Sequence, residues 1–135
     1  MLSSARDAEC CMNDPVLGRG DARPSLQIDT FPVAGSLSEV VFESTELTAI
    51  CPVTDGPDIY DMKISYTPAA KCIESKSLKL YLETFRNRRI FAEHLAPELA
   101  GHLAAAVEAP VTVELRQHTR GGIVTTVTAR AAGGS

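Results

Sequence analysis

The chain has 135 residues and a net charge of −4; 44% of the residues are hydrophobic and 22% charged, a balance typical of one soluble globular domain. The negative net charge argues against a protein that binds nucleic acid through a basic surface. No apolar run approaches the roughly 20 residues that a membrane-spanning helix needs. Because residues 1–14 also lack the features of a signal peptide, we expect a cytoplasmic protein.

The two ends of the chain lack the periodicity of packed elements. Residues 1–30 are rich in Pro, Gly, Asp and Arg, so we predict a flexible N-terminal arm there, and we expect a frayed tail over residues 131–135. A single domain is predicted between them, over residues 31–130. The cysteines share no CxxC spacing, and we expect no metal site from Cys10, Cys11, Cys51 and Cys72.

The first predicted elements are two strands. Residues 38–50 are rich in β-branched and apolar side chains with partial alternation, which favours a strand. Residues 59–66 alternate Tyr60, Met62 and Ile64 with more polar neighbours, which predicts a second strand. The short connection between them predicts a hairpin.

Two helices are predicted next. Residues 76–89 carry Leu78, Tyr81 and Phe85 at helical spacing, and their basic end suits a helix C-terminus. The second helix has Leu95, Leu99 and Leu103 on one face, and Pro97 is expected near its first turn, where proline is tolerated.

Two further strands complete the pattern. Residues 111–116 and 123–128 are β-branched segments, joined by a turn at Arg120-Gly121-Gly122. The predicted order is therefore β-β-α-α-β-β. This order indicates an α+β domain with two helices covering one face of an antiparallel sheet, whose edges assembly could close.

The segment Cys51-Pro52-Val53-Thr54-Asp55-Gly56-Pro57-Asp58 carries the chemistry that we consider first. It places a thiol and a carboxylate seven residues apart across a turn with two prolines. A thiolate is a strong side-chain nucleophile, and a carboxyl group can supply or accept a proton. Taken alone, the pattern is more typical of a small buried cysteine followed by an aspartate that caps a turn.

Further motifs change this interpretation. Together with Cys51–Asp58, four segments resemble the QueF family of nitrile reductases: Glu74–Tyr81 (Glu-Ser-Lys-Ser-Leu-Lys-Leu-Tyr), Phe85-Arg86-Asn87, Glu93 and Thr119–Gly122. The resemblance runs from about residue 40 to residue 128, and the octapeptide is its most specific part. It implies the tunnelling fold, a β-β-α-α-β-β unit that assembles into a ring, here in the short single-unit form.

The resemblance also implies a reaction. The substrate would be 7-cyano-7-deazaguanine (preQ0), whose nitrile carbon Cys51 would attack to form a covalent thioimide, while Asp58 donates a proton to the nitrile nitrogen. Two hydrides from NADPH would then give the aminomethyl product preQ1, in queuosine biosynthesis for tRNA modification. A homo-oligomer would place the active sites between subunits, so that Cys51 and Glu93 could come from neighbouring chains.

The resemblance assigns the substrate-binding residues as well. Glu93 would accept hydrogen bonds from the amino and ring N–H groups of the base. The alternative for Glu93 is an acidic residue that complements the helix dipole. Ile73, Glu74 and Ser75 would line the substrate pocket.

Three basic residues are candidates for the cofactor. Lys76 and Lys79 lie three residues apart on one helix face and would bind NADPH phosphates, although alone they are typical of a solvated helix start. Arg120 could reach a phosphate or cap a tight turn, and the sequence favours neither.

Two positions depart from the family pattern. Gly56 stands where the family usually has Gln, and Ala92 stands where reductases usually carry His immediately before the anchoring glutamate. His94 points roughly 200° away on a helix, so it would need a local backbone shift to replace that imidazole.

Three alternatives to the reductase stay open. A QueF-like amidinotransferase would add ammonia to the same thioimide, and a non-catalytic 7-deazapurine-binding protein would keep Glu93 alone. A relative of GTP cyclohydrolase would need metal ligands, for which the sequence offers no obvious Cys/His set.

Overall fold

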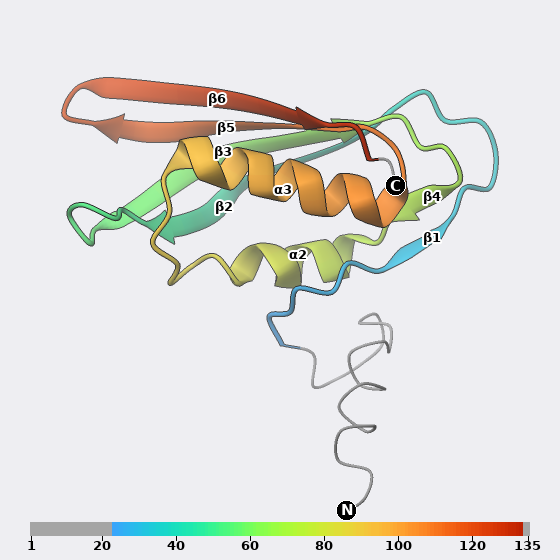
Figure 1. Ribbon diagram of the computed structural model, residues 1–135, viewed down its shortest axis with the longest axis horizontal. Helices are drawn as coiled ribbons and strands as arrows, with labels where there is room; N and C mark the ends of the chain where they lie inside the picture. Colours follow the sequence, from blue (N-terminus) through green and yellow to red (C-terminus); the bar gives the residue numbers. More distant parts are fainter. Residues whose placement is uncertain (1–22, 134–135) are drawn as a thin grey trace, which may run out of the picture.

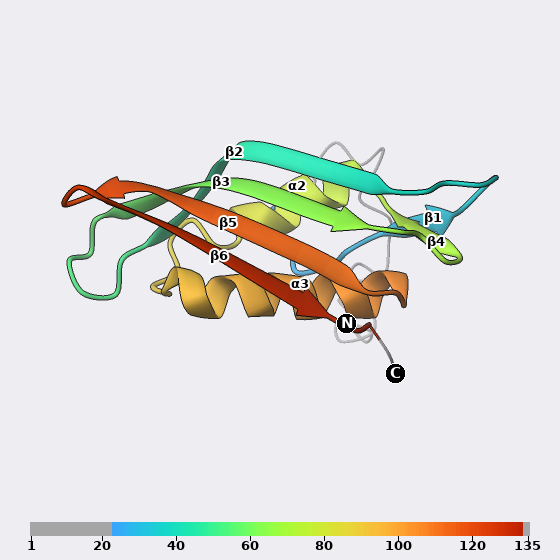
Figure 2. The same cartoon turned by 90° about the horizontal axis from the view of Figure 1, so that it is seen from above.

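The computed structural model describes residues 23–133, and within them the four long strands and two helices follow the predicted order. The long strands form one antiparallel sheet in the order β2-β3-β5-β6, and both helices lie on the same face of it (Figures 1 and 2). This arrangement confirms the α+β prediction. The elements are β1 (Thr30–Pro32), β2 (Val40–Ile50), β3 (Pro57–Tyr66), β4 (Lys71–Ile73), α2 (Ser75–Glu83), α3 (Ala92–Val107), β5 (Val111–Arg120) and β6 (Ile123–Ala131).

Strand β3 shows why the sheet has one covered face. Its side chains alternate between exposed and buried, so that every second residue from Asp58 to Tyr66 points toward the helices. The predicted hairpin with β2 is present, and on its other side β3 pairs with β5 in a register that sets Tyr60 opposite Gln117. The covered face therefore begins with a carboxylate and continues as apolar core.

Helix α3 supplies the other half of the core. Leu95, Leu99 and Leu103 are fully buried at a spacing of four residues, and the helix packs over β5 and β6. Pro97 is the sixth residue of the helix and lies in its second turn, one turn later than predicted, because the helix already begins at Ala92, directly after the extended residue Phe91.

Helix α2 is shorter than the predicted span of residues 76–89. It ends at Glu83, and the chain continues through tight turns in which backbone N–H groups donate to carbonyls three residues earlier. This segment then pairs with the end of β2: the Ile50 N–H donates to the carbonyl of Arg88 at 2.9 Å, and the Ile50 carbonyl accepts from the N–H of Ile90 at 3.1 Å. Tertiary pairing therefore overrides the helical periodicity there.

Two short strands were not predicted. β1 and β4 pair antiparallel over three residues each, a length too short to show a period in the sequence. Just before β1, the Ser25 N–H donates to the carbonyl of Leu80, and the Asp29 N–H donates to Ser77 Oγ at 2.9 Å. Residues 23–29 of the predicted arm thus lie against α2, whereas residues 1–22 and 134–135 fall outside the described part. No helix within residues 23–133 is long and apolar enough to cross a membrane.

Candidate active site

The loop that joins β2 to β3 presents Cys51. The Cys51 N–H donates to the carbonyl of Gly56 at 2.8 Å, and the Asp55 N–H donates to the carbonyl of Cys51 at 3.0 Å. Asp55, with φ 63°, takes the left-handed conformation of the turn, which aspartate tolerates better than most residues. Nothing in the turn requires glycine at Gly56, since a Cβ there would lie at an ordinary 3.4 Å from Thr54 Oγ1. The loop is therefore closed by its own backbone.

Two arginines bind this loop. Arg89 forms an ion pair with Asp55 and donates to the carbonyl of Pro52 at 3.1 Å. Arg120, at the end of β5, donates to Thr54 Oγ1 at 3.1 Å. Both contacts join the loop to segments far along the chain, so they fix the position of the thiol relative to the sheet.

The surroundings of Cys51 favour its nucleophilic form. Hydrogen bonds from the Thr54 hydroxyl, and then from the backbone N–H groups of Thr54 and Val53, lower the pKa of Cys51 below its ordinary value. Partial burial and the Asp58 carboxylate oppose this shift without cancelling it. The half-buried thiol is thus both accessible and activated, which a covalent nucleophile requires.

This electrostatic environment predicts a pH dependence. Alkylation of Cys51 by iodoacetamide needs the thiolate, so its rate should rise with pH and level off at a lower pH than for an unperturbed cysteine. Thr54→Val should move that midpoint upward, because it removes the largest cause of the shift. Peptide mapping of the alkylated site as a function of pH measures both curves, and coincident midpoints would contradict the assignment.

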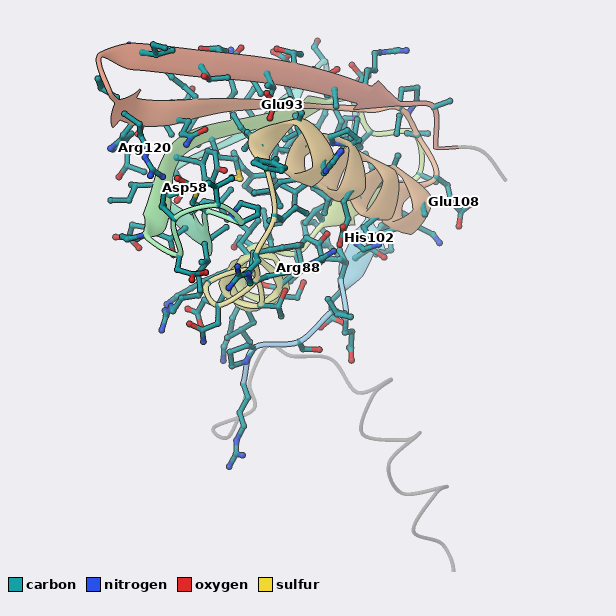
Figure 3. All side chains as sticks on the ribbon, turned by 60° about the vertical axis from the view of Figure 1, so that its left-hand side comes forward. Asp58, Arg88, Glu93, His102, Glu108 and Arg120 are labelled. Carbon is teal, nitrogen blue, oxygen red and sulfur yellow. The ribbon has the colours of Figure 1, made fainter. Side chains whose placement is uncertain are left out.

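Asp58 lies beside Cys51 on the covered face of the sheet. The residue is only 3% exposed and accepts a hydrogen bond from Gln117 Nε2 at 3.0 Å. Its carboxylate also forms an ion pair with Arg120, and Figure 3 shows the two side chains meeting at one end of the sheet. The register of β3 and β5 produces both contacts, since it brings the end of β5 alongside the start of β3.

Arg120 therefore has partners that the sequence did not reveal. Its guanidinium binds Asp58 and Thr54, and the Asp58 carboxylate raises the pKa of Arg120 above its ordinary value. These contacts within the chain join the nucleophile loop to the buried acid. Binding of a cofactor phosphate by Arg120 stays a prediction.

Glu93 occupies the first turn of α3, toward the same end of the molecule as Asp58 and Arg120 (Figures 1 and 3). It is exposed and has no hydrogen-bond or ion-pair partner among residues 23–133, so its carboxylate is available to a ligand. Ala92 before it is buried and offers no polar group. His94 is exposed and rests edge-on against the ring of Phe91, so no backbone shift returns its imidazole to the site.

The second group of predicted residues lies elsewhere. Ile73 ends β4, and Glu74 and Ser75 begin α2, at the end of the fold opposite the Cys51 loop (Figures 1 and 2). Glu74 caps the helix, because its two carboxylate oxygens accept from the N–H groups of Lys76 and Ser77 at 2.8 and 2.7 Å. All three residues line a largely apolar groove of about 620 Å³. Within a single chain, Ile73, Glu74 and Ser75 therefore do not lie near Cys51.

The predicted cofactor lysines lie on α2, along the same side of the fold. Lys79 lines a groove of about 210 Å³ between α2 and β2, together with Ser75 and Arg86. Cationic side chains in such a groove fit the phosphates of a nucleotide, although Glu43, Glu46 and Glu83 share its lining. Lys76 occupies the first turn of the helix, three residues before Lys79, and the binding of NADPH phosphates by either lysine stays a prediction.

Four residues at the site were not found from the sequence: Tyr60, whose pKa burial and the charges of Asp58, Glu93 and Cys51 raise, Arg89, Gln117 and, as an activating group, Thr54. Gln117 and Arg89 reach the site only through long-range pairing, for which the sequence carries no signal. Tyr60 could have been found, because a residue two positions after Asp58 on a strand shares its face. Among residues 23–133, no group of three His, Cys, Asp or Glu side chains could hold a metal ion.

Fold and site together define an α+β protein of the tunnelling-fold class with a half-buried cysteine whose pKa is lowered. A family model described as QueF-like protein matches residues 57–133. A protein of Frankia casuarinae named NADPH-dependent 7-cyano-7-deazaguanine reductase is 43% identical over 79% of this chain and 86% of its own length. A protein of Syntrophus aciditrophicus with the same name is 42% identical over 84% of this chain and 83% of its own length.

A solved structure shares the fold as well. The crystal structure of the archaeosine synthase QueF-Like in the apo form superimposes with a TM-score of 0.67, covering 75% of this chain and 99% of that one at 25% identity. This structural similarity, the family match and the sequence relatives together show that the chain belongs to the QueF family.

Proposed function

We propose that this protein is an NADPH-dependent reductase that converts the nitrile of 7-cyano-7-deazaguanine to the aminomethyl group of preQ1, in queuosine biosynthesis. The observation that carries the proposal is the lowered pKa of the Cys51 thiol, in a loop that lies beside the buried Asp58 and its ion pair with Arg120. The names of the relatives support the same substrate and the same reductant.

The chemistry follows from these two side chains. In the free chain Asp58 accepts hydrogen bonds, so before it can donate a proton it must take one, and the neighbouring Cys51 thiol is the group that gives one up. The thiolate then attacks the nitrile carbon, a C–S bond forms, and Asp58 returns the proton to the nitrile nitrogen to complete the thioimide.

Two molecules of NADPH, bound in succession, would each supply one hydride. Reduction of the thioimide would release the sulfur of Cys51 as a thiolate and leave an imine, and reduction of the imine with uptake of a proton would give the amine. The active site must keep the imine away from water. At the end of the reaction Cys51 is again a free thiol and Asp58 a carboxylate. Ala92 offers no imidazole, so these proton movements proceed without the histidine that reductases usually have.

Glu93 orients the base in this proposal. Its unpaired carboxylate can accept two hydrogen bonds from the amino and ring N–H groups of a guanine-like edge. The first turn of α3 also favours an acid through the helix dipole, and this contribution is compatible with the anchor role.

We also propose a cytoplasmic homo-oligomer. Ile73, Glu74 and Ser75 lie at the opposite end of the fold from Cys51, so a second copy must supply them if they line the same pocket. The sheet offers suitable edges, since β2 and β6 are its outer strands, and Ile123 and Val124 of β6 are exposed apolar residues. Pairing of such edges closes a ring with active sites between subunits.

A second candidate is an amidinotransferase that adds ammonia to the same thioimide. The shared fold with an archaeosine synthase QueF-Like favours it, and the Cys51 and Asp58 geometry serves it equally well. The intact Glu74–Tyr81 octapeptide favours the reductase instead.

Mixing the protein with preQ0 tests the proposal. Without NADPH we expect one covalent adduct per chain, seen in the intact mass and in the thioimide absorbance. Adding NADPH should remove the adduct as NADPH is oxidised and preQ1 appears, which would also show that Ala92 is tolerated. An adduct that resists NADPH but yields to ammonium would establish the amidinotransferase, and no adduct would contradict both.

A further inference from the structure

Within residues 23–133, the hydroxyl of Tyr60 is the one buried side-chain polar group without a hydrogen-bond partner. Tyr60 is fully buried, and its hydroxyl has no hydrogen bond within residues 23–133. The other two tyrosines of the described chain are paired: the Tyr66 hydroxyl accepts from the N–H of Ile73 at 2.8 Å, and the Tyr81 hydroxyl bonds His102 Nδ1 at 2.7 Å. An unpaired buried hydroxyl destabilises the free protein, and a partner that arrives with a ligand would offset this cost.

The hydroxyl belongs to the active site rather than to the remote core. Tyr60 follows Asp58 by two residues on the covered face of β3, opposite Gln117, which itself bonds Asp58. Burial, and then the charges of Asp58, Glu93 and Cys51, raise the pKa of Tyr60 to about 12. The side chain therefore stays a hydroxyl at physiological pH and can act only as a neutral donor or acceptor.

The neighbours of Tyr60 indicate how a ligand would reach it. Cys51, Glu93 and Arg120 all influence this hydroxyl, and all three are at least partly exposed. The hydroxyl thus lies within electrostatic range of both Cys51 and the anchoring carboxylate of Glu93. A ligand bound between Cys51 and Glu93 would therefore lie near it.

We infer that the Tyr60 hydroxyl contacts the substrate directly and donates a hydrogen bond to the 6-oxo group of the deazapurine. This inference rests on the proposed function. When Glu93 holds the ring N–H and amino groups and Cys51 attacks the nitrile at position 7, the 6-oxo oxygen is the acceptor on the ring edge between these two points. It is also a strong hydrogen-bond acceptor, which a neutral hydroxyl can pair.

Binding measurements in a Cys51→Ala background test this contact, because there preQ0 binds reversibly. Adding Tyr60→Phe should weaken the binding of preQ0 about tenfold, the scale of one lost hydrogen bond to a buried acceptor. The binding of 7-deazaguanine, which has the 6-oxo group but no nitrile, should weaken by the same factor. The melting temperature should stay the same or rise, since no hydrogen bond is lost in the free protein.

Tyr81→Phe serves as the matched control. It removes a paired hydroxyl, so it should lower the melting temperature and leave both dissociation constants unchanged. If the Cys51→Ala protein with Tyr60 intact binds neither compound, both the proposed function and the inference are contradicted. If it binds both and Tyr60→Phe binds them equally well, only the inference fails. Weakened binding of preQ0 alone would assign the hydroxyl to the nitrile and overturn the 6-oxo contact.

Discussion

Replacement of Cys51 by alanine is expected to abolish both the covalent preQ0 adduct and NADPH-dependent turnover. The thiolate is the group that forms the bond to the nitrile carbon, and removing the nucleophile of an enzyme with a covalent intermediate can lower the rate on the order of 10⁶-fold. Cys72 cannot take its place, because it is buried in β4 at the other end of the fold. Intact mass and NADPH absorbance measure the two losses.

The same variant should keep its site in other respects. Alanine preserves the backbone bonds between Cys51 and Gly56 and between Asp55 and Cys51, so the loop keeps its shape. Calorimetry should therefore still detect reversible binding of preQ0 through the anchoring carboxylate of Glu93. Continued turnover in a Cys51→Ala protein whose sequence has been verified would rule out the thioimide route, whereas loss of reversible binding as well would contradict the proposed binding of preQ0 through Glu93.

The sequence predicts the long elements of this fold because their apolar residues repeat with a clear period. The hairpin of β2 and β3 and the buried leucine face of α3 follow from this repetition alone. The end of α2 could not be predicted, because Arg88 and Ile90 form backbone hydrogen bonds with β2, which lies about forty residues earlier in the sequence. β1 and β4 were missed because three residues are too few to show alternation.

The candidate site divides in the same way. Cys51 and Asp58 stand in one short motif, so sequence alone proposes them as a pair. The partners that position Asp58 come from elsewhere: Gln117 and Arg120 lie 59 and 62 residues beyond it and reach it only through the register of β3 and β5. Glu74 shows the converse, since a residue proposed to bind substrate is also the N-cap of α2, a role its position before the helix already allowed.

Replacement of Asp58 by asparagine is the second change with a large expected effect. Asparagine keeps the size of the side chain and an oxygen that can accept from Gln117, but it can neither take a proton from Cys51 nor give one to the nitrile nitrogen. Loss of a positioned acid–base group slows catalysis by about 10²–10⁴-fold, and we expect kcat to fall by that factor. The dissociation constant of preQ0 should change little, because Glu93 still holds the base.

Asp61→Asn is the matched control for this change. Asp61 lies three residues further along β3 and points to the opposite face, where its carboxylate makes a partly exposed hydrogen bond with His118 Nε2 at 2.9 Å. Its replacement removes the same charge from the same strand, yet it should leave kcat unchanged. Equal rates for Asp58→Asn and the unmodified protein would show that the nitrile nitrogen receives its proton from another group. Because Asp58 acts before the first hydride, the single-turnover rate of adduct formation should fall together with kcat, and an adduct that forms at full speed would place Asp58 in the later steps instead.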